Sequence, residues 1–221
     1  MSTNGNPQDW HDGCVRDAAR NHFIIPEIIN ITNNKKLSNL GFLGCATGYI
    51  PEQVSQAVSV NKFILIDTDT DRLEYAQTLD YQNVIVEFYD QPLEKADWST
   101  KLDAMIISNT LLEFEVSRRF IQIAKSFLKQ SGKVIIFLPD TLEDVVQDYV
   151  SGNRLSLTKF IAGVTEVEKI DKFTLVKTDF FAHRFISLTK MFLDCGFTLL
   201  RISISSTKPK YYMLLLQVEE I

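Results

Sequence analysis

From Leu37 onward, short apolar runs alternate with longer amphipathic stretches. The apolar runs are Leu40–Leu43, Phe63–Ile66, Val84–Phe88, Ala104–Ile107 and Val134–Leu138. Continuous runs of this length are typical of strands buried on both faces, as in a parallel sheet covered by helices. Helices are predicted between them, at Pro51–Ser59, Asp71–Leu79 and Val116–Lys129, with Gly132 as a stop after the last one. The pattern predicts a doubly wound, mostly parallel α/β sheet with right-handed crossovers.

The two ends of the chain complete this layout. After a short polar leader, Val15–Ile31 has apolar residues at helical spacing, and Pro26 should restart or kink that helix. Near the C-terminus, a helix at Ser187–Asp194 should stop at Gly196. The last two runs, Phe197–Ile204 and Tyr211–Val218, predict an antiparallel pair at the sheet edge, which gives the sheet an antiparallel C-terminal edge strand.

The region Thr141–Phe181 interrupts the alternation. It combines helical patches, Leu142–Val150 and Leu157–Val164, with a short run at Phe173–Val176. We interpret residues 141–181 as a helical lid insertion above the carboxyl ends of the strands, where ligands of such folds bind. No domain-separating linker is visible, so we expect one domain, with an N-terminal helical segment at 1–36 and the α/β domain at 37–221.

Composition and charge narrow the classes of partner. With 45% hydrophobic and 23% charged residues, the chain has the composition of a soluble globular protein. Its net charge of −5 disfavours nucleic acid as a partner. The cysteines, Cys14, Cys45 and Cys195, have no metal-ligand spacing, so we expect no metal and a reducing compartment. Without a signal-peptide pattern or a membrane-spanning run, we expect a cytoplasmic protein with no membrane partner. We expect the protein to be a monomer or a homodimer.

The sharpest motif is Leu-Gly-Cys-Ala-Thr-Gly, at Leu43–Gly48, between the first predicted strand and a helix. Glycines at such a turn let the backbone come close to a ligand that a β-carbon would exclude. A simple strand-to-helix turn is the alternative interpretation of this segment.

Acidic residues follow the next two predicted strands. Asp67 comes directly after the second strand, where its carboxylate can accept both hydroxyls of a ribose. Asp90 follows the third strand and can accept from an adenine amino group. Each has an alternative role, because Asp is common in helix caps and turns, and Asp69 and Asp71 compete for the capping role near Asp67.

Taken together and in this order, these elements resemble the class I S-adenosylmethionine-dependent methyltransferases, particularly the type 11 group that acts on small molecules. The resemblance covers about Leu37–Leu138, and the tail more loosely. Further matches are Leu102–Phe114, Ile123–Leu138 and the Gly196-Phe197 pair.

The resemblance implies S-adenosylmethionine as cofactor, with S-adenosylhomocysteine as product, and assigns residues to it. Gly44, Cys45, Ala46, Gly48 and Tyr49 would line its methionine and ribose part. Asp67 with Thr68 would hold the ribose, Asp90 with Gln91 would meet the adenine, and Asn109 would lie near the methionine end or the acceptor.

The chain departs from this family pattern at two positions. Ala46 replaces the middle glycine of the usual three. Phe42 replaces the acidic residue that usually lies two positions before the first glycine, which removes an anchor for the methionine end. A nicotinamide-dependent oxidoreductase is a competing interpretation, but its G-x-G-x-x-G spacing is absent, since the glycines are Gly41, Gly44 and Gly48.

Candidates for the acceptor side are fewer. His183 follows the insertion and has a pKa suited to a general base, although it could equally hold loop backbone together. Trp10, in the N-terminal segment, and Glu113, after the fourth strand, are further candidates to contact substrate, with surface and helix-start roles as alternatives. We expect methyl transfer to a small-molecule acceptor; the alternative is a binding or partner protein of the same fold without transferase activity.

Overall fold

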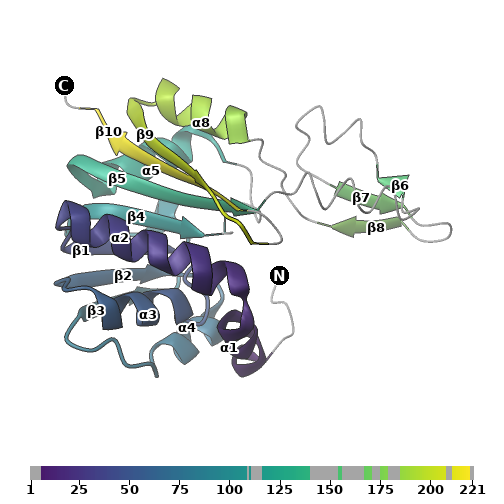
Figure 1. The fold of residues 1–221 in the computed structure, drawn as a ribbon, viewed down its shortest axis with the longest axis horizontal. Helices are drawn as coiled ribbons and strands as arrows, with labels where there is room; N and C mark the ends of the chain where they lie inside the picture. The colour runs from purple at the N-terminus through teal and green to yellow at the C-terminus, as the bar shows by residue number, and fades with distance from the viewer. Residues whose placement is uncertain are drawn as a thin grey trace.

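A computed structural model describes residues 6–108, 110, 116–139, 154–155, 167–170, 175–178, 185–207 and 211–219. Its main body is a seven-stranded sheet with helices on both faces (Figure 1). Within the described residues, no helix combines the length and apolar character needed to cross a bilayer.

The sheet has the strand order β3-β2-β1-β4-β5-β10-β9. Its five parallel strands are β1 (Asn39–Leu43), β2 (Lys62–Ile66), β3 (Ile85–Tyr89), β4 (Leu102–Ser108) and β5 (Leu128–Pro139). Each contains nearly all of the apolar run that predicts it. The mostly parallel doubly wound sheet is therefore confirmed.

The antiparallel pair at the C-terminus is confirmed as well. β9 (Phe197–Ile204) and β10 (Tyr211–Val218) pair antiparallel, and β10 also pairs antiparallel with β5. Consequently β10 runs antiparallel to both of its neighbours, and β9 is the last strand at this end of the sheet. Helix α8 (Phe185–Asp194) precedes them and ends before Gly196, whose φ of +79° allows the left-handed stop.

The helices divide between the two faces. α2 (Ile25–Lys35) and α3 (Tyr49–Ala57) pack on one face, and Figure 1 shows α2 crossing it. α5 (Arg118–Phe127) and α8 pack on the other. α4 (Thr70–Ala76) follows β2, and only a 3-10 turn, η2 (Leu93–Lys95), lies between β3 and β4. Because the strands are covered on both sides, their apolar runs are continuous.

The N-terminal segment is more helical than its polarity suggests. The predicted polar leader contains α1 (Pro7–Arg16), with Asn6 as N-cap. A short π-helix, η1 (Arg20–Ile24), leads into α2, and Pro26 lies in the first turn of α2. The predicted restart or kink at Pro26 coincides with the change from π-helix to α-helix, and the backbone stays helical through Ile24 and Ile25.

The prediction that Gly132 ends a helix is wrong. α5 stops at Phe127, because Leu128 already pairs with Leu102 as the start of β5. Gly132 lies inside β5, where an added β-carbon would come within 2.8 Å of Leu128 Cβ and of the Lys129 carbonyl oxygen. This position thus needs glycine for a close approach, not for a helix stop.

Part of the predicted insertion consists of short strands. β6 (Arg154–Leu155), β7 (Val167–Ile170) and β8 (Leu175–Thr178) form an antiparallel sheet, which Figure 1 draws apart from the large one. The run predicted near Phe173–Val176 overlaps β8. Both predicted helical patches of the insertion lie outside the described residues.

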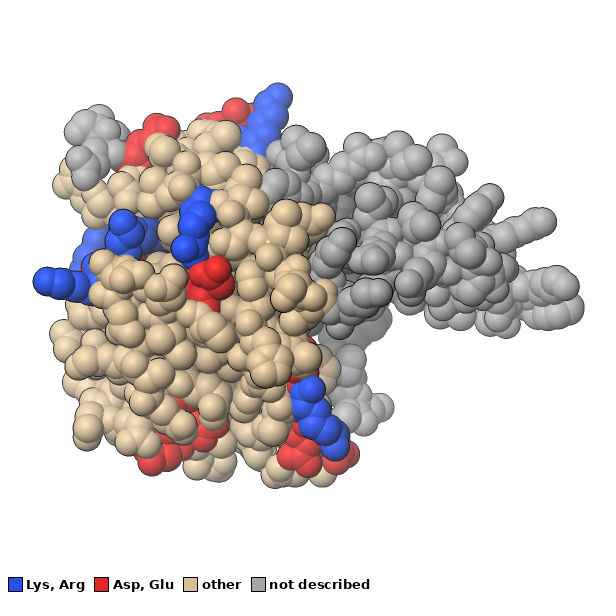
Figure 2. All heavy atoms as spheres, in the orientation of Figure 1, with Lys and Arg blue, Asp and Glu red and all other residues tan. Residues whose placement is uncertain are grey.

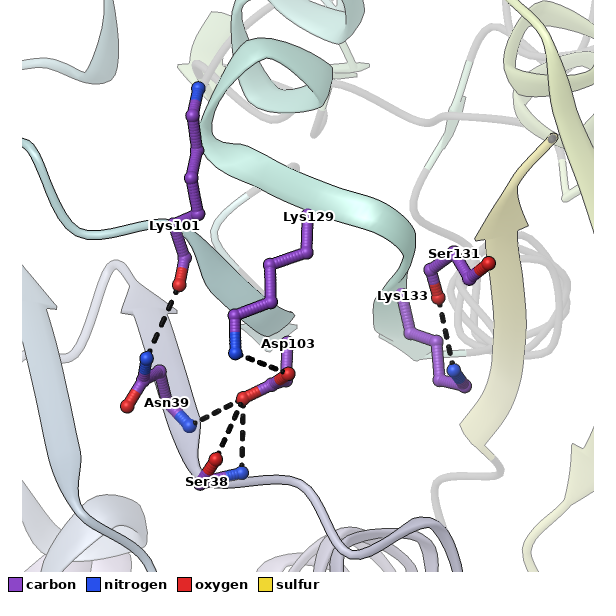
Figure 3. Close-up of polar contacts among 7 residues, drawn as sticks. All are labelled: Ser38, Asn39, Lys101, Asp103, Lys129, Ser131 and Lys133. Atoms are coloured by element: carbon purple, nitrogen blue, oxygen red, sulfur yellow. Dashed lines mark hydrogen bonds and ion pairs between the residues drawn. The ribbon is translucent and has the colours of Figure 1, made fainter. Parts of the chain in front are cut away.

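At the amino ends of the strands, Asp103 joins β1 to β4 (Figure 3). Its carboxylate accepts from the backbone N–H groups of Ser38 and Asn39, at 3.1 and 2.8 Å, and pairs with Lys129 at 2.8 Å. Burial by itself would raise the pKa of Asp103, but Lys129 and these N–H groups outweigh it and hold the pKa below its ordinary value.

Candidate functional site

The loop after β1 bends over the end of β2. The N–H groups of Gly44 and Cys45 both donate to the carbonyl of Ile66, at 2.8 and 3.1 Å. Alternate residues of the loop are left-handed, with φ of +68° at Gly44, +49° at Ala46 and +78° at Gly48. Glycine adopts this conformation freely, whereas at Ala46 it costs about 1–2 kcal/mol. A strained residue held in such a loop points to a functional site.

Asp67 holds this strained residue in place. One carboxylate oxygen accepts from the Ala46 N–H at 2.6 Å, and the other accepts from the Asp69 N–H at 2.9 Å. Burial raises the pKa of the carboxyl group, and these two hydrogen bonds only partly offset it. A carboxylate can accept about four hydrogen bonds. Asp67 therefore keeps acceptor capacity for a ligand beside the loop.

Thr110 gives a further reason for the glycine at position 44, beside the ligand and the turn that the sequence suggests. The Thr110 hydroxyl donates to the carbonyl of Leu43 at 3.0 Å. A β-carbon added to Gly44 would lie only 1.9 Å from the Thr110 Oγ1. Thr110 is 66 residues away in sequence, so no local signal predicts this contact.

Phe42 belongs to the core. Its side chain is 3% exposed and meets the Phe63 ring edge-on, with ring centroids 5.0 Å apart. The position that carries an acid in the family pattern is thus occupied by packed apolar surface. An anchor for the methionine end has to come from another residue.

The end of β4 supplies a polar group that sequence reasoning missed. Ser108 Oγ is buried and, within the described part of the chain, has no hydrogen-bond partner. Ser108 is the last residue of β4, directly after Ile107, which pairs with Leu43 at the end of β1. A buried hydroxyl without a partner is costly, so it is a candidate to meet a ligand at these strand ends.

The ends of β2 and β3 are also adjacent, because the Asp67 N–H donates to the Tyr89 carbonyl at 3.1 Å. Asp90 follows directly and is exposed, while Gln91 is partly buried. Thr68 is exposed beside Asp67. The structure thus brings the predicted ribose and adenine residues to neighbouring strand ends.

Helix α1 packs against the helices that start after β1 and β2. The Arg72 guanidinium lies 4.0 Å from the centre of the Trp10 ring. His11 contacts the rings of Tyr49 and Tyr75, at centroid distances of 5.5 and 5.0 Å. Trp10, predicted to contact substrate, is therefore engaged with α4, although 39% of it remains exposed.

Cys45 lies within the loop as a free thiol. Burial raises its pKa well above the ordinary value, and the nearby Asp67 carboxylate adds to the shift. The thiol is therefore neutral at pH 7 and unsuited to act as a nucleophile. Among the described residues, no three His, Cys, Asp or Glu side chains cluster closely enough to hold a metal ion.

The other predicted site residues, Asn109, Glu113 and His183, lie outside the described residues.

Comparison with known sequences identifies the family. Residues 43–178, more than half of the chain, match the profile of a methyltransferase domain. The chain belongs to this methyltransferase family. The matched segment begins at the last residue of β1, immediately before the left-handed loop. No curated protein sequence matches the chain significantly.

Solved methyltransferase structures share the fold. The magnesium protoporphyrin IX methyltransferase of Synechocystis PCC 6803, with bound S-adenosylhomocysteine, is 17% identical with a TM-score of 0.66, covering 91% of this chain and 84% of that chain. A methyltransferase from Clostridium acetobutylicum ATCC 824 is 13% identical with a TM-score of 0.67, covering 96% and 98%. The N-methyltransferase NodS from Bradyrhizobium japonicum WM9, in complex with S-adenosylhomocysteine, is 9% identical with a TM-score of 0.59, covering 98% and 100%. These likenesses show the Rossmann-like methyltransferase fold.

Proposed function

We propose that this methyltransferase binds S-adenosylmethionine at the carboxyl ends of β1 to β4 and transfers its methyl group to a small-molecule acceptor. The observation that carries the proposal is Asp67, which holds the left-handed Ala46 and keeps acceptor capacity on its carboxylate. Two of the structural neighbours were crystallised with S-adenosylhomocysteine, the product of such a reaction.

The described residues fit this cofactor at two of its parts. Asp67 can accept the ribose hydroxyls, and the exposed Asp90 can accept from the adenine amino group. The left-handed loop from Gly44 to Gly48, with Tyr49 after it, presents backbone to the remaining part. By the same resemblance, Thr68, Gln91 and Asn109 complete the proposed contacts.

The methionine end needs an anchor other than position 42. We assign this role to Ser108, because its hydroxyl is buried without a partner in the described residues and lies at a strand end beside the loop. A buried hydroxyl can donate to a carboxylate. Ser108 would therefore anchor the cofactor through the carboxylate of its methionine end, although the usual acid is missing.

The cofactor supplies an activated methyl group, and the protein's own task is to hold the acceptor in line with it. Much of the acceleration in such a displacement comes from orientation, so a dedicated base is optional. We propose His183 as a base for an acceptor hydroxyl or ammonium group, and Trp10 and Glu113 as further acceptor contacts. The reaction would take place in the cytoplasm.

A methyltransferase-fold partner protein without transferase activity is the second candidate. The packed side chain of Phe42 favours it, because an aromatic core residue cannot replace the carboxylate of the family pattern. A nicotinamide-dependent oxidoreductase is disfavoured by the spacing of Gly41, Gly44 and Gly48.

Calorimetric titration separates these candidates. The purified protein is titrated separately with S-adenosylmethionine, S-adenosylhomocysteine and NAD. Binding of the first two with micromolar affinity, and none of NAD, is the expected result. Absence of binding by either adenosyl ligand at about 1 mM, an affinity weaker than about −4 kcal/mol, would overturn the proposed function.

A further inference from the structure

The outermost strand, β9, has a free edge. It spans Phe197–Ile204 and pairs only with β10 among the described strands. Within the described part of the chain, no strand pairs with the backbone N–H and C=O groups on its other side, which can therefore accept another strand. Free edges of this kind accept a strand from a second chain unless the sequence protects them.

Large apolar side chains are exposed along this strand. Leu200 is 43%, Ile202 is 44% and Ile204 is 59% exposed. Ile202 pairs with Leu214 and Ile204 with Tyr212, and paired residues point to the same face of a sheet. At the start of β9, Phe192 of α8 covers Phe197, with ring centroids 5.3 Å apart. The apolar side chains near the end of β9 remain open.

The usual protection of an edge strand is missing from this segment. Between Phe197 and Ile204 there is no Pro, Lys, Asp or Glu, and the single charged residue is Arg201. Arg201 forms an ion pair with Glu27 of α2, so its charge is compensated within the same chain. Figure 2 shows charged side chains only sparsely on the face that α2 crosses. Within β9 itself, no uncompensated charge therefore opposes pairing with an identical strand.

Part of the edge is regular enough to pair. The β9–β10 ladder shifts register between Leu215 and Leu216, which distorts β9 near Leu200. From Arg201 to Ile204 the register is continuous. A partner strand can therefore extend the sheet along this half of β9.

We propose that a second copy of this chain pairs with β9 in antiparallel orientation about a two-fold axis at Ser203. In this register Ile202 lies opposite the partner's Ile204, and the reverse, so four isoleucines meet on one face of the joined sheet. Arg201 lies opposite the partner's Ser205 and not opposite another arginine. The match of the edge to itself favours a second copy over an unrelated peptide, because a two-fold contact must be self-complementary.

The proposed pairing predicts the affinity of the dimer and the positions of its two cofactor sites. A ladder of three residues a side, Ile202 to Ile204, buries less than the roughly 1,200 Å² of standard interfaces, so we expect a dissociation constant in the micromolar range. Antiparallel pairing reverses the strand directions in the partner sheet. The two candidate cofactor sites then open at opposite edges of the joined sheet, and neither completes the other.

Sedimentation equilibrium of the full chain from about 1 to 200 μM tests the proposal, since this range brackets micromolar affinity. Wild-type protein is expected to dimerise reversibly. Ile202→Lys and Ile204→Lys should each weaken dimerisation tenfold or more with unchanged circular dichroism. Ile85→Lys is the matched control, because Ile85 is 63% exposed on the opposite edge strand, β3, and this variant should dimerise like wild type.

A cross-link tests the register. Directly opposite residues of an antiparallel pair have Cα atoms about 4.5–5.5 Å apart, within the range of a disulfide. Oxidised Ser203→Cys should therefore form a covalent dimer, whereas Thr198→Cys and wild type should not. A wild-type protein that stays monomeric across the range, or lysine variants that dimerise normally, would overturn the proposal.

Discussion

The Asp67 carboxylate accepts a hydrogen bond from the Ala46 N–H over 2.6 Å. Ala46 has a φ of +49°, a conformation that glycine adopts more easily. The residue proposed to bind the ribose thus also holds the loop in the shape that the ligand requires. The proposed cofactor contact and the stability of the loop are coupled through this one side chain.

Ala46→Gly should stabilise the protein. Glycine relieves the left-handed strain, and the gain exceeds the backbone entropy that glycine loses, so the free energy of unfolding should rise by about 0.5–1 kcal/mol. Urea denaturation measures this change. Ala57→Gly is the control, since Ala57 is exposed at the end of α3 in helical conformation and should lose stability. Equal losses in both variants would mean that Ala46 is not strained.

Asp67→Ala should weaken binding of S-adenosylhomocysteine by about tenfold or more, because hydrogen bonds to a charged acceptor contribute about 1.5–3 kcal/mol. Calorimetric titration provides the affinity. Asp69→Ser is the control, since Ser still caps α4 and the change leaves Asp67 in place. Affinity should also fall as acidification protonates Asp67, and at a higher pH than for an ordinary aspartate, because burial raises its pKa. Unchanged affinity in Asp67→Ala would remove the ribose assignment.

Gly44→Ala should conflict with Thr110. The new β-carbon meets Thr110 Oγ1 and also forces alanine into a φ of +68°, which together should cost more than about 2 kcal/mol. Adding Thr110→Ala should recover the steric part that comes from the Thr110 hydroxyl and methyl groups, and leave the strain and the 2.7 Å approach to the Cβ of residue 110. A double-mutant cycle by urea denaturation measures the coupling, and strictly additive losses would show that Thr110 does not cover Gly44 in solution. The larger Gly44→Val should abolish binding of S-adenosylhomocysteine while the protein stays folded.

Asp103 should contribute to acid stability. Its folded-state pKa lies below the ordinary value, so its contribution is fully present above the unfolded-state pKa of about 3.9 and is lost as pH falls through the folded-state pKa. Asp103→Ala should lower the free energy of unfolding at pH 7 by about 1–3 kcal/mol, because two partly buried N–H groups lose their acceptor. The difference between variant and wild type should shrink at low pH. A difference that is independent of pH would contradict this origin.

His183→Ala should lower turnover by roughly a hundredfold if His183 is the base, with cofactor affinity nearly unchanged. The measurement compares turnover and calorimetric affinity on the same variant, once an acceptor is found by screening. His22→Ala is the control, because His22 is exposed in η1. Parallel loss of turnover, affinity and thermal stability would indicate a structural role instead.

The sequence by itself determined which segments form the strands of the mostly parallel sheet. Burial on both faces requires an uninterrupted apolar run, so runs such as Phe63–Ile66 mark their strands directly. The positions of the glycine loop, Asp67 and Asp90 at strand ends follow from the same alternation, because parallel strands end at one edge.

Tertiary structure decided what depends on residues far apart in the chain. Three features of the site arise only when separate strands are brought together. They are the contact of Thr110 with Gly44, the packing of Phe42 on Phe63 and the unpartnered hydroxyl of Ser108. Likewise, α5 ends at Phe127 because Leu128 pairs with Leu102, although the local helical pattern continues. Local patterns report burial and periodicity, whereas a contact between distant residues depends on the strand order and register of the folded sheet.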